Sequence, residues 1–403
     1  MGNMKDLLIS VLMVNYNHED TIRETINSVL NQTYKNIQFI IIDDGSTDNS
    51  CKIINEFNDD RIELFKLEKN EHICYATNFG FSKVKGQLLA RIDSDDIWYP
   101  TKLERQMKFM HENEECQVCF SWCDLIDENG CLINELEAGL FKLYQARFDS
   151  QEECLQRFYF KGNCLAQPSV LMETEVMRKI GDFELTYKQL HDFDYWIRIA
   201  KCYKIYVIPE RLIAVRRFRK DNKKNENASA TNEANDTRVF NEYIDIREHF
   251  FDDMSEELFV STFRKEFVCE DSCTPLELEC EKAFLLCKPQ DGWNGIPPAG
   301  IRKFKVLFRN EQAKNILEKK YHFTIKDLYI LTQNHIYYDN LIRNKNENLI
   351  NKLELLMDNI SNENLILHKE IDFYKEEISR YRESTSWKIT KPFRTIGKLL
   401  RRN

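Results

Sequence analysis

The most informative segment of this chain is Gln87-Leu-Leu-Ala-Arg-Ile-Asp-Ser-Asp-Asp96. Its first part, Leu88 to Ile92, is a mainly apolar run typical of a buried strand, and three carboxylates follow within four residues. Side chains alternate between the two faces of a strand, so Asp93 and Asp95 can point the same way. Mg²⁺ and Mn²⁺ prefer such oxygen ligands and take the others from water and substrate phosphates. The stretch therefore predicts a divalent-metal site at the end of a strand.

A plainer interpretation of these aspartates is the start of a helix. Asp-x-Asp is common by chance, so the motif alone is weak. A helix is expected to follow, with Pro100 in its first turn and with Thr101 and Glu104 forming a capping box. On this interpretation Asp96 is only a solvated turn residue. This stretch by itself leaves both interpretations open.

Composition limits the class of protein. The chain has 403 residues, enough for two or three domains, and its net charge of −9 argues against general nucleic-acid binding. It contains no apolar run long enough to span a membrane and no secretory signal segment, so we expect neither a membrane span nor secretion. The 13 cysteines are scattered and odd in number. Even the cluster Cys116-x-x-Cys119-x-x-x-Cys123 lacks a second metal-binding pair, so reduced core cysteines are expected.

Strands and helices alternate in the first hundred residues. Strand-like apolar runs are expected at 7–14, 37–42, 62–67 and 88–92, with helices between them, the first capped by Asp20. This order implies right-handed β-α-β crossovers and an α/β fold with a mainly parallel sheet. In such sheets, ligands bind beyond the carboxyl ends of the strands.

Three polar clusters fall at these strand ends. They are Asn15-Tyr16-Asn17, Asp43-Asp44-Gly45-Ser46 and Asp93-Ser94-Asp95. Neither of the usual glycine-rich phosphate loops is present in the sequence. A bound diphosphate would therefore need another source of positive charge, and a carboxylate-held metal supplies one.

These motifs resemble, in order and spacing, the family 2 inverting glycosyltransferases of the bacterial surface-polysaccharide type. The resemblance covers roughly residues 5–218 and implies the GT-A fold, a Rossmann-like mixed and mainly parallel sheet with flanking helices. The motifs that carry it are Val11-Leu-Met-Val-Asn-Tyr-Asn17, Asp43-Asp-Gly-Ser-Thr-Asp48, Asn78-x-Gly80, Arg91-Ile-Asp-Ser-Asp-Asp96, Gly181-Asp-Phe183 and His191-Asp-Phe-Asp-Tyr-Trp-Ile-Arg198.

The resemblance also implies roles on the donor side. Asn15, Tyr16 and Asp44 would bind the nucleotide-sugar, and Asp93 would approach its ribose or the metal. Asp95 would hold Mn²⁺ or Mg²⁺ against the diphosphate. From the residues alone, Tyr16 is also compatible with a core aromatic and Asp44 with a turn residue before glycine.

On the acceptor side, the resemblance implies that Asp192 is the general base. His191 stands where the family usually has Glu, and a histidine can itself titrate near neutrality. A helix N-cap is the alternative for Asp192. Arg216 is the candidate on a mobile segment that closes on the diphosphate, with a solvated basic edge as the alternative. Asn78 is expected to stabilise a loop rather than to contact substrate.

The chain is predicted to continue as a series of helical parts. Heptad-like apolar positions at 349–381, with Glu363 at one of them, favour either a homodimer or packing on the chain's own domain. The last residues hold six Lys and Arg, no acid and Trp387, which favours an anionic membrane surface, or else a disordered terminus. The predicted parts are a GT-A catalytic domain at 1–219 (nucleotide-sugar half 1–112, acceptor half 113–219), an exposed loop at 220–237, a helical extension at 238–340, a long heptad-like helix at 341–383 and a basic amphipathic tail at 384–403.

Together these features predict an inverting, metal-dependent glycosyltransferase. Its donor would be a UDP- or dTDP-sugar and its acceptor a glycan or lipid-linked glycan. It would be cytoplasmic, peripheral on the inner face of the cell membrane, and without a nucleic-acid partner. The alternatives are a sugar nucleotidyltransferase on a similar sheet and a non-enzymatic membrane-surface scaffold. The four carboxylates Asp44, Asp93, Asp95 and Asp192 argue against the scaffold.

Overall fold

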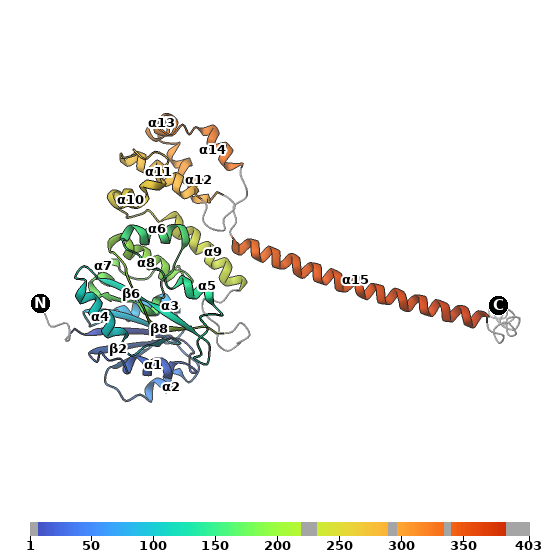
Figure 1. The fold of residues 1–403 in the computed structure, drawn as a ribbon, viewed down its shortest axis with the longest axis horizontal. Helices are drawn as coiled ribbons and strands as arrows, with labels where there is room; N and C mark the ends of the chain where they lie inside the picture. The colour runs from blue at the N-terminus through green and yellow to red at the C-terminus, as the bar shows by residue number, and fades with distance from the viewer. Residues whose placement is uncertain (1–6, 219–231, 289–295, 334–339, 384–403) are drawn as a thin grey trace. The chain divides into compact units, whose positions relative to one another are not determined.

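The computed structural model describes residues 7–218, 232–288, 296–333 and 340–383 (Figure 1). The chain divides into a first unit that ends at Tyr337 and a second unit that begins at Tyr338. The predicted loop at 220–237 lies largely outside the described residues, and helix α9 begins within it at Glu233. The predicted basic tail at 384–403 lies wholly outside them.

Within the described residues, eight strands form one sheet in the order β3-β2-β1-β4-β7-β6-β8-β5. The strands β1 to β4 run parallel, whereas β7 is antiparallel to both β4 and β6, and β5 is antiparallel to β8. The predicted mixed, mainly parallel α/β sheet is therefore confirmed. The strands are β1 Ile9–Asn15, β2 Ile37–Asp43, β3 Ile62–Lys66, β4 Leu88–Asp93, β5 Ile97–Trp98, β6 Val118–Ile126, β7 Leu171–Glu173 and β8 Tyr206–Arg216.

Helices cover both faces of the sheet, which explains the unbroken apolar runs of its strands. In β1, Leu12 packs into the core on one face, and Val11 and Met13 pack into the core on the other. The core around Val11 includes residues of α1, α2 and α4, and the core around Leu12 includes residues of α3, α6, α7 and α8. These helices are α1 Ile22–Leu30, α2 Ser50–Asn55, α3 His72–Phe81, α4 Lys102–Glu112, α5 Ala138–Leu143, α6 Gln151–Lys161, α7 Thr174–Ile180 and α8 His191–Cys202.

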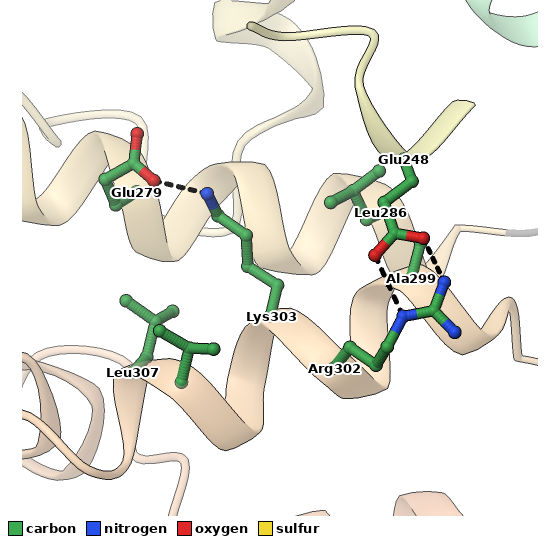
Figure 2. Close-up of a pocket in the computed structure, with 8 residues that line it drawn as sticks. Glu248, Glu279, Leu286, Ala299, Arg302, Lys303 and Leu307 are labelled. Atoms are coloured by element: carbon green, nitrogen blue, oxygen red, sulfur yellow. Dashed lines mark hydrogen bonds and ion pairs between the residues drawn. The ribbon is translucent and has the colours of Figure 1, made fainter. Parts of the chain in front are cut away.

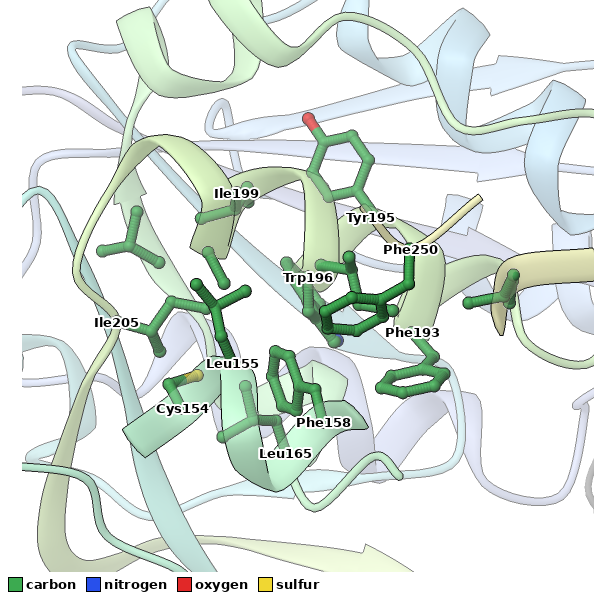
Figure 3. Packing of buried hydrophobic residues seen from close by; sticks show 14 of the residues in the cluster. Cys154, Leu155, Phe158, Leu165, Phe193, Tyr195, Trp196, Ile199, Ile205 and Phe250 are labelled. Carbon is green, nitrogen blue, oxygen red and sulfur yellow. The ribbon is translucent and has the colours of Figure 1, made fainter. Parts of the chain in front are cut away.

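The helices between residues 233 and 307 share a core with the sheet domain. Phe250, which follows α9, packs among Phe158 of α6 and Phe193 and Trp196 of α8 (Figure 3). Around the buried Tyr159 ring, the Phe250 and Phe251 rings both lie 5.0 Å away between centroids. A third, smaller core joins α11 to α14. The helices are α9 Glu233–Glu248, α10 Glu256–Phe263, α11 Pro275–Cys287, α12 Pro298–Leu307, α13 Glu311–Lys319 and α14 Ile325–Thr332.

The second unit contains α15, Asn340–Glu383, a continuous helix of 44 residues. Its side chains from residue 346 onward are exposed. Among the described residues, no helix has both the length and the apolar character needed to cross a bilayer.

Two local predictions about helix starts were wrong. Helix α1 is preceded by Thr21 rather than capped by Asp20. Thr101 precedes α4 but makes no side-chain capping bond to the described residues, and Glu104 instead accepts a hydrogen bond from the Thr33 hydroxyl at 2.8 Å. A tertiary contact thus takes the carboxylate that the capping box would have used. The cysteine prediction is confirmed for the cluster, because Cys116, Cys119 and Cys123 are buried free thiols, whereas Cys131, Cys202 and Cys273 are exposed.

Candidate active site

The parallel register of β1, β2 and β4 brings three polar strand ends together. Asn15 pairs with Asp43 across β1 and β2, and Val14 pairs with Asp93 across β1 and β4. The Asn15 side-chain amide donates to Asp43 Oδ2 at 2.8 Å and to Ser46 Oγ at 3.1 Å. Because Asn15 is fully buried, this amide joins the strand ends rather than reaching outward, which differs from the direct nucleotide contact that the resemblance implies.

Tyr16 and Asp44 lie beside this junction. Tyr16 is 41% exposed, so the core-aromatic alternative is wrong. Asp44 is buried, and its Oδ1 accepts from the Glu71 backbone N–H at 2.7 Å. Burial raises the pKa of Asp44 above its usual value, against the lowering effect of that backbone bond. An exposed ring thus stands next to a shielded carboxylate.

The turn after β4 is held from several sides. The Asp96 Oδ1 accepts from the Arg216 backbone N–H at 2.8 Å, and Asp96 is buried, so its interpretation as a solvated turn residue is wrong. The Thr25 hydroxyl of α1 lies 3.1 Å from the Ser94 carbonyl and 2.9 Å from the Asp96 carbonyl. Burial, followed by repulsion from the neighbouring aspartates, raises the pKa of Asp96 well above its usual value.

Arg216 fastens the same turn through its guanidinium. Its Nε donates to the Asp95 carbonyl at 2.8 Å, its Nη1 to the Asp127 and Glu128 carbonyls at 3.1 Å, and its Nη2 forms an ion pair with Glu24 at 2.6 Å. The side chain is 1% exposed, so the solvated-edge alternative is wrong. This placement also differs from the predicted mobile arm, because each guanidinium nitrogen already has a protein acceptor.

Asp192 lies in the first turn of α8, within hydrogen-bonding distance of two protein donors. Its Oδ2 accepts from the Asn163 amide at 3.0 Å, and its Oδ1 from the Phe193 backbone N–H at 2.7 Å. The residue at the N-cap is Leu190, so the N-cap alternative for Asp192 is wrong. Burial raises the pKa of Asp192 to about 6, against the lowering effect of both bonds.

The sequence allowed His191 to titrate near neutrality, and the structure does not support this. Its Nδ1 lies 3.0 Å from the Lys188 carbonyl. Burial and the nearby Arg91 cation lower its pKa to about 4. His191 is therefore neutral at neutral pH, and Asp192 is the better proton acceptor of the two.

Arg91 is a site residue to which the sequence analysis gave no role. It is fully buried and interacts electrostatically with both Asp93 and Asp192. Burial raises the pKa of Asp93 to about 6; Arg91 lowers it, and Asp95 and Asp192 raise it further. The signal was present in the sequence, because Arg91 interrupts an apolar strand two residues before Asp93 and so shares its face.

The Arg91 guanidinium also lies over the Phe183 ring, 5.3 Å from its centroid. The Asn78 amide donates to the Phe183 carbonyl at 2.9 Å, and its Oδ1 accepts from the Phe183 N–H at 2.8 Å. As predicted, Asn78 stabilises a loop. That loop carries Phe183, whose ring contacts Arg91.

These side chains are candidate ligands for a divalent metal ion. In the described ranges, no three His, Cys, Asp or Glu side chains are grouped so that they would hold a metal by themselves. Asp93 and Asp95 offer two carboxylates at one strand end, and their repulsion is part of what raises the pKa of Asp93. The pair therefore fits a divalent ion that takes its other ligands from a diphosphate and water.

Known proteins resemble this chain in sequence and in fold. The family model described as glycosyl transferase family 2 matches residues 10–166. An uncharacterized glycosyltransferase of Methanocaldococcus jannaschii is 33% identical over 228 residues, which are 55% of this chain and 75% of the relative. An Escherichia coli protein named UDP-Glc:alpha-D-GlcNAc-diphosphoundecaprenol beta-1,3-glucosyltransferase WfaP is 40% identical over 126 residues, which are 31% of this chain and 49% of that protein.

Among solved structures, Staphylococcus aureus TarS 1–349 in complex with UDP-GlcNAc aligns with a TM-score of 0.51 and 16% identity. The alignment covers 81% of this chain and 89% of that one, and it supports the fold. The chain spans 64% and 65% of two further relatives, uncharacterized glycosyltransferases of Rickettsia typhi and Rickettsia prowazekii.

Proposed function

The chain belongs to glycosyltransferase family 2, and we propose that it is an inverting enzyme of cell-surface polysaccharide synthesis. It transfers one sugar from a nucleotide diphosphate-sugar to a glycan or lipid-linked acceptor. The observation that carries this proposal is that Asp93, at the end of β4, interacts electrostatically with the buried Arg91, with Asp95 and with Asp192 of α8. Neither the nucleotidyltransferase nor the scaffold alternative is favoured by the family assignment.

Asp192 is the proposed general base. A base must accept the proton of the acceptor hydroxyl while that oxygen attacks the anomeric carbon. With a pKa raised by burial to about 6, Asp192 is deprotonated at neutral pH and is more basic than an ordinary aspartate. Asn163 and the Phe193 N–H orient its two oxygens.

Tyr16 and Asp44 are the proposed base pocket of the donor. The exposed Tyr16 ring offers a stacking surface. The Asp44 carboxylate offers an acceptor for the imide N–H of a pyrimidine. A UDP-sugar is supported by the printed name of the Escherichia coli relative and by the UDP-GlcNAc named with the Staphylococcus aureus structure. The same relative's name includes a diphosphoundecaprenol, which supports a lipid-linked acceptor.

Asp95, with Asp93, is the proposed ligand pair for Mn²⁺ or Mg²⁺. Such an ion supplies charge that offsets the negative charge developing on the leaving diphosphate. Arg216 has a different proposed role from the one that the resemblance implies. By bonding the Asp95 carbonyl and donating its own backbone N–H to Asp96, it holds the ligand turn in shape.

The test is transfer and donor hydrolysis across a panel of UDP- and dTDP-sugars, with Mn²⁺, with Mg²⁺ and with a chelator. We expect turnover of at least one donor that depends on the added metal. The matched pair is Asp192→Asn and Asp194→Asn, because Asp194 lies on the same helix but pairs with Arg198 at 2.9 Å. Equal activity of these two variants would exclude Asp192 as the base, and no turnover of any donor by the unmodified chain would exclude the function.

Two further partners are proposed, namely a second copy of the chain through 349–381 and an anionic membrane surface on the inner face of the cell membrane. Each basic residue near an anionic surface contributes about 1 kcal/mol. Binding of the full chain to vesicles with anionic lipid should weaken as salt rises. Deletion of 385–403 should abolish co-flotation with these vesicles and leave transfer to a small acceptor unchanged. If the shortened chain floats as well as the full one, the tail is not the anchor.

A further inference from the structure

Helix α9 presents a carboxylate to the segment that leads into the proposed base. Glu242 is 6% exposed. Its Oε1 accepts from the Lys188 backbone N–H at 2.8 Å, and its Oε2 accepts from the Gln189 and Leu190 backbone N–H groups at 2.8 and 2.7 Å. These residues immediately precede α8, whose second residue is Asp192. One side chain from a later helix thus holds three consecutive amides beside the base.

Two more residues of α9 bind the same segment. The Asn235 Oδ1 accepts from the Gln189 side-chain amide at 3.1 Å, and the Asp245 Oδ2 accepts from the Tyr187 hydroxyl at 2.6 Å. Residues 235, 242 and 245 are seven and three positions apart, so they share one face of the helix. The segment before α8 is therefore bonded along a whole face of α9.

The helix α9 is itself anchored in the core. Its Arg247 is 3% exposed and donates to the Tyr159 carbonyl of α6 at 3.1 Å and to the Lys288 carbonyl after α11 at 2.8 Å. Its Tyr243 ring stacks on Phe193, with 6.1 Å between centroids. The carboxylate of Glu242 is thus a fixed point to which the residues before Asp192 are attached.

We infer that Glu242 is a positioning residue for Asp192, and that the helical extension thereby sets the acceptor-side base; this rests on the proposed function. Hydrogen bonds to an ionised acceptor are stronger than those between neutral groups. Without the carboxylate, three backbone donors lose their partner in a buried place. A displacement of about 1 Å at a catalytic group lowers the rate by roughly 10²-fold.

The test compares Glu242→Gln with Glu248→Gln on the same helix. Glu248 pairs with Arg302 in a pocket between α11 and α12 (Figure 2). We expect Glu242→Gln to lower kcat by about tenfold or more, with the dissociation constant for UDP, measured by calorimetry, within about twofold of the original. Glu242→Asp should keep more of the rate than Glu242→Gln. A folded Glu242→Gln enzyme with unchanged kcat, or an equal loss of UDP affinity, would overturn the inference.

Hydrogen–deuterium exchange separates this inference from the proposed function. The amides of residues 188–190 should exchange faster in Glu242→Gln than in the unmodified chain and in Glu248→Gln. Unchanged exchange would refute the attachment whether or not the chain transfers sugar. Exchange could rise in Glu242→Gln while the unmodified chain turns over no donor. In that case Glu242 does hold residues 188–190, but its role in positioning a catalytic base is refuted together with the proposed function.

A second inference concerns α15, on which an apolar seam faces solvent. Every residue of the seam is at least 49% exposed. Such a seam is typical of a helix that pairs with another helix. The seam residues are Leu349, Leu353, Leu356, Ile360, Leu367, Ile371, Tyr374, Ile378 and Tyr381.

The spacing of the seam indicates its register. Isoleucines at 360, 371 and 378 fall at the a position of the heptad, and leucines at 349 and 356 fall at d. The interval from Ile360 to Ile371 is four residues longer than a heptad, an insertion that locally unwinds the supercoil without ending it. In parallel coiled coils, β-branched residues at a with leucine at d favour two strands over three or four.

The charges beside the seam match a parallel pair and provide a test against an antiparallel one. Glu370 and Glu377 occupy g positions, and Lys375 and Arg382 follow five residues later at e. In two parallel helices, each g residue faces the e residue five positions later on the other copy, so glutamates meet cations. In an antiparallel pair g faces g, so Glu370 would face Lys352 when the two helices overlap fully. Reversing Lys375 and Arg382 therefore compensates for reversing the glutamates only in a parallel pair. We propose that a second copy of this chain covers the seam as a parallel two-stranded coiled coil.

The test is sedimentation of the full chain. Glu370→Lys with Glu377→Lys should weaken the dimer by about tenfold or more, because like charges then face each other. Adding Lys375→Glu and Arg382→Glu to that same chain should restore the dimer. Glu376→Lys, on the outer face of the helix, is the matched control and should have little effect. A monomeric unmodified chain, or a dimer indifferent to these reversals, would overturn the proposal.

Discussion

Charged side chains lie close together both at the strand ends of the sheet and in the pocket between α11 and α12. In the pocket the acids are neutralised by basic partners, whereas at the strand ends neighbouring acids repel each other. The pocket holds about 360 Å³, and its acids are paired with bases: Glu248 with Arg302 and Glu279 with Lys303 (Figure 2). Burial favours a raised pKa for Glu279, but Lys282 and Lys303 hold it below its usual value. Burial instead raises the pKa values of Asp93, at the end of β4, and of Asp192, in the first turn of α8, to about 6.

This difference between paired and mutually repelling carboxylates indicates which of the two regions could bind a cationic ligand. Paired surface ions contribute little to stability and leave no charge for a ligand. Carboxylates that are buried together repel each other until a cation or a proton arrives, and such perturbed groups mark functional sites. The comparison therefore assigns chemistry to the strand ends and a structural role to the pocket.

The largest effect is expected from the proposed metal ligand. Asp95→Ala should lower transfer by about 10³-fold or more, because charge on the leaving diphosphate is then no longer offset. Glu279→Ala, which removes an acid of the pocket, should leave the rate unchanged. Both variants should keep their melting temperature within a few degrees of the original. Full activity of Asp95→Ala in the presence of a chelator would refute the metal assignment.

The next effect concerns the base. Asp192→Asn keeps the shape of the side chain but cannot accept the proton, so single-turnover transfer should slow by roughly 10²-fold. Affinity for the donor should change little, since Asp192 is assigned to the acceptor. His191→Ala should be milder, because His191 is neutral, with a pKa of about 4. If His191→Ala proves the more damaging change, the two roles must be exchanged.

The pH profile gives a smaller effect with a defined sign. Burial raises the pKa of Asp192 to about 6, and only its deprotonated form can act as a base. The transfer rate should therefore rise with pH through about 6 and then level off, falling by about tenfold per unit below that value. The profile of Asp192→Asn should lose this inflection. An inflection that persists in the variant would assign it to another group, Asp93 first.

The smallest effect is expected from the pocket itself. Arg302→Ala breaks a half-exposed ion pair with Glu248, which should change the free energy of unfolding by at most about 1 kcal/mol. Transfer should be unaffected. Denaturant titration and the transfer assay check the two statements. A tenfold loss of transfer in a stable Arg302→Ala variant would mean that the pocket is part of the active site.

Much of the fold was predictable because its signals are local. The apolar runs of β1, β2 and β4 are buried on both faces, and each ends in polar residues. Parallel pairing then places those ends at one edge of the sheet. The helix starts were less predictable. Glu104 stands three residues after Thr101, as a capping box requires, but its carboxylate accepts a hydrogen bond from Thr33 instead. The alternative of a core aromatic at Tyr16 could be excluded only from the exposure of its ring in the structure.

The sequence alone predicts the first four strands with helices between them, a mainly parallel sheet and the carboxylates at its strand ends, because these follow from the periodicity of neighbouring residues. Which charged side chains are already bound to other parts of the protein depends on the tertiary structure. Arg216 bonds the turn of Asp95 across 121 residues, and Glu242 bonds the amides before Asp192 across 52 to 54 residues. Hydrogen bonds between segments so far apart depend on how the layers pack, and no local pattern of residue types encodes that.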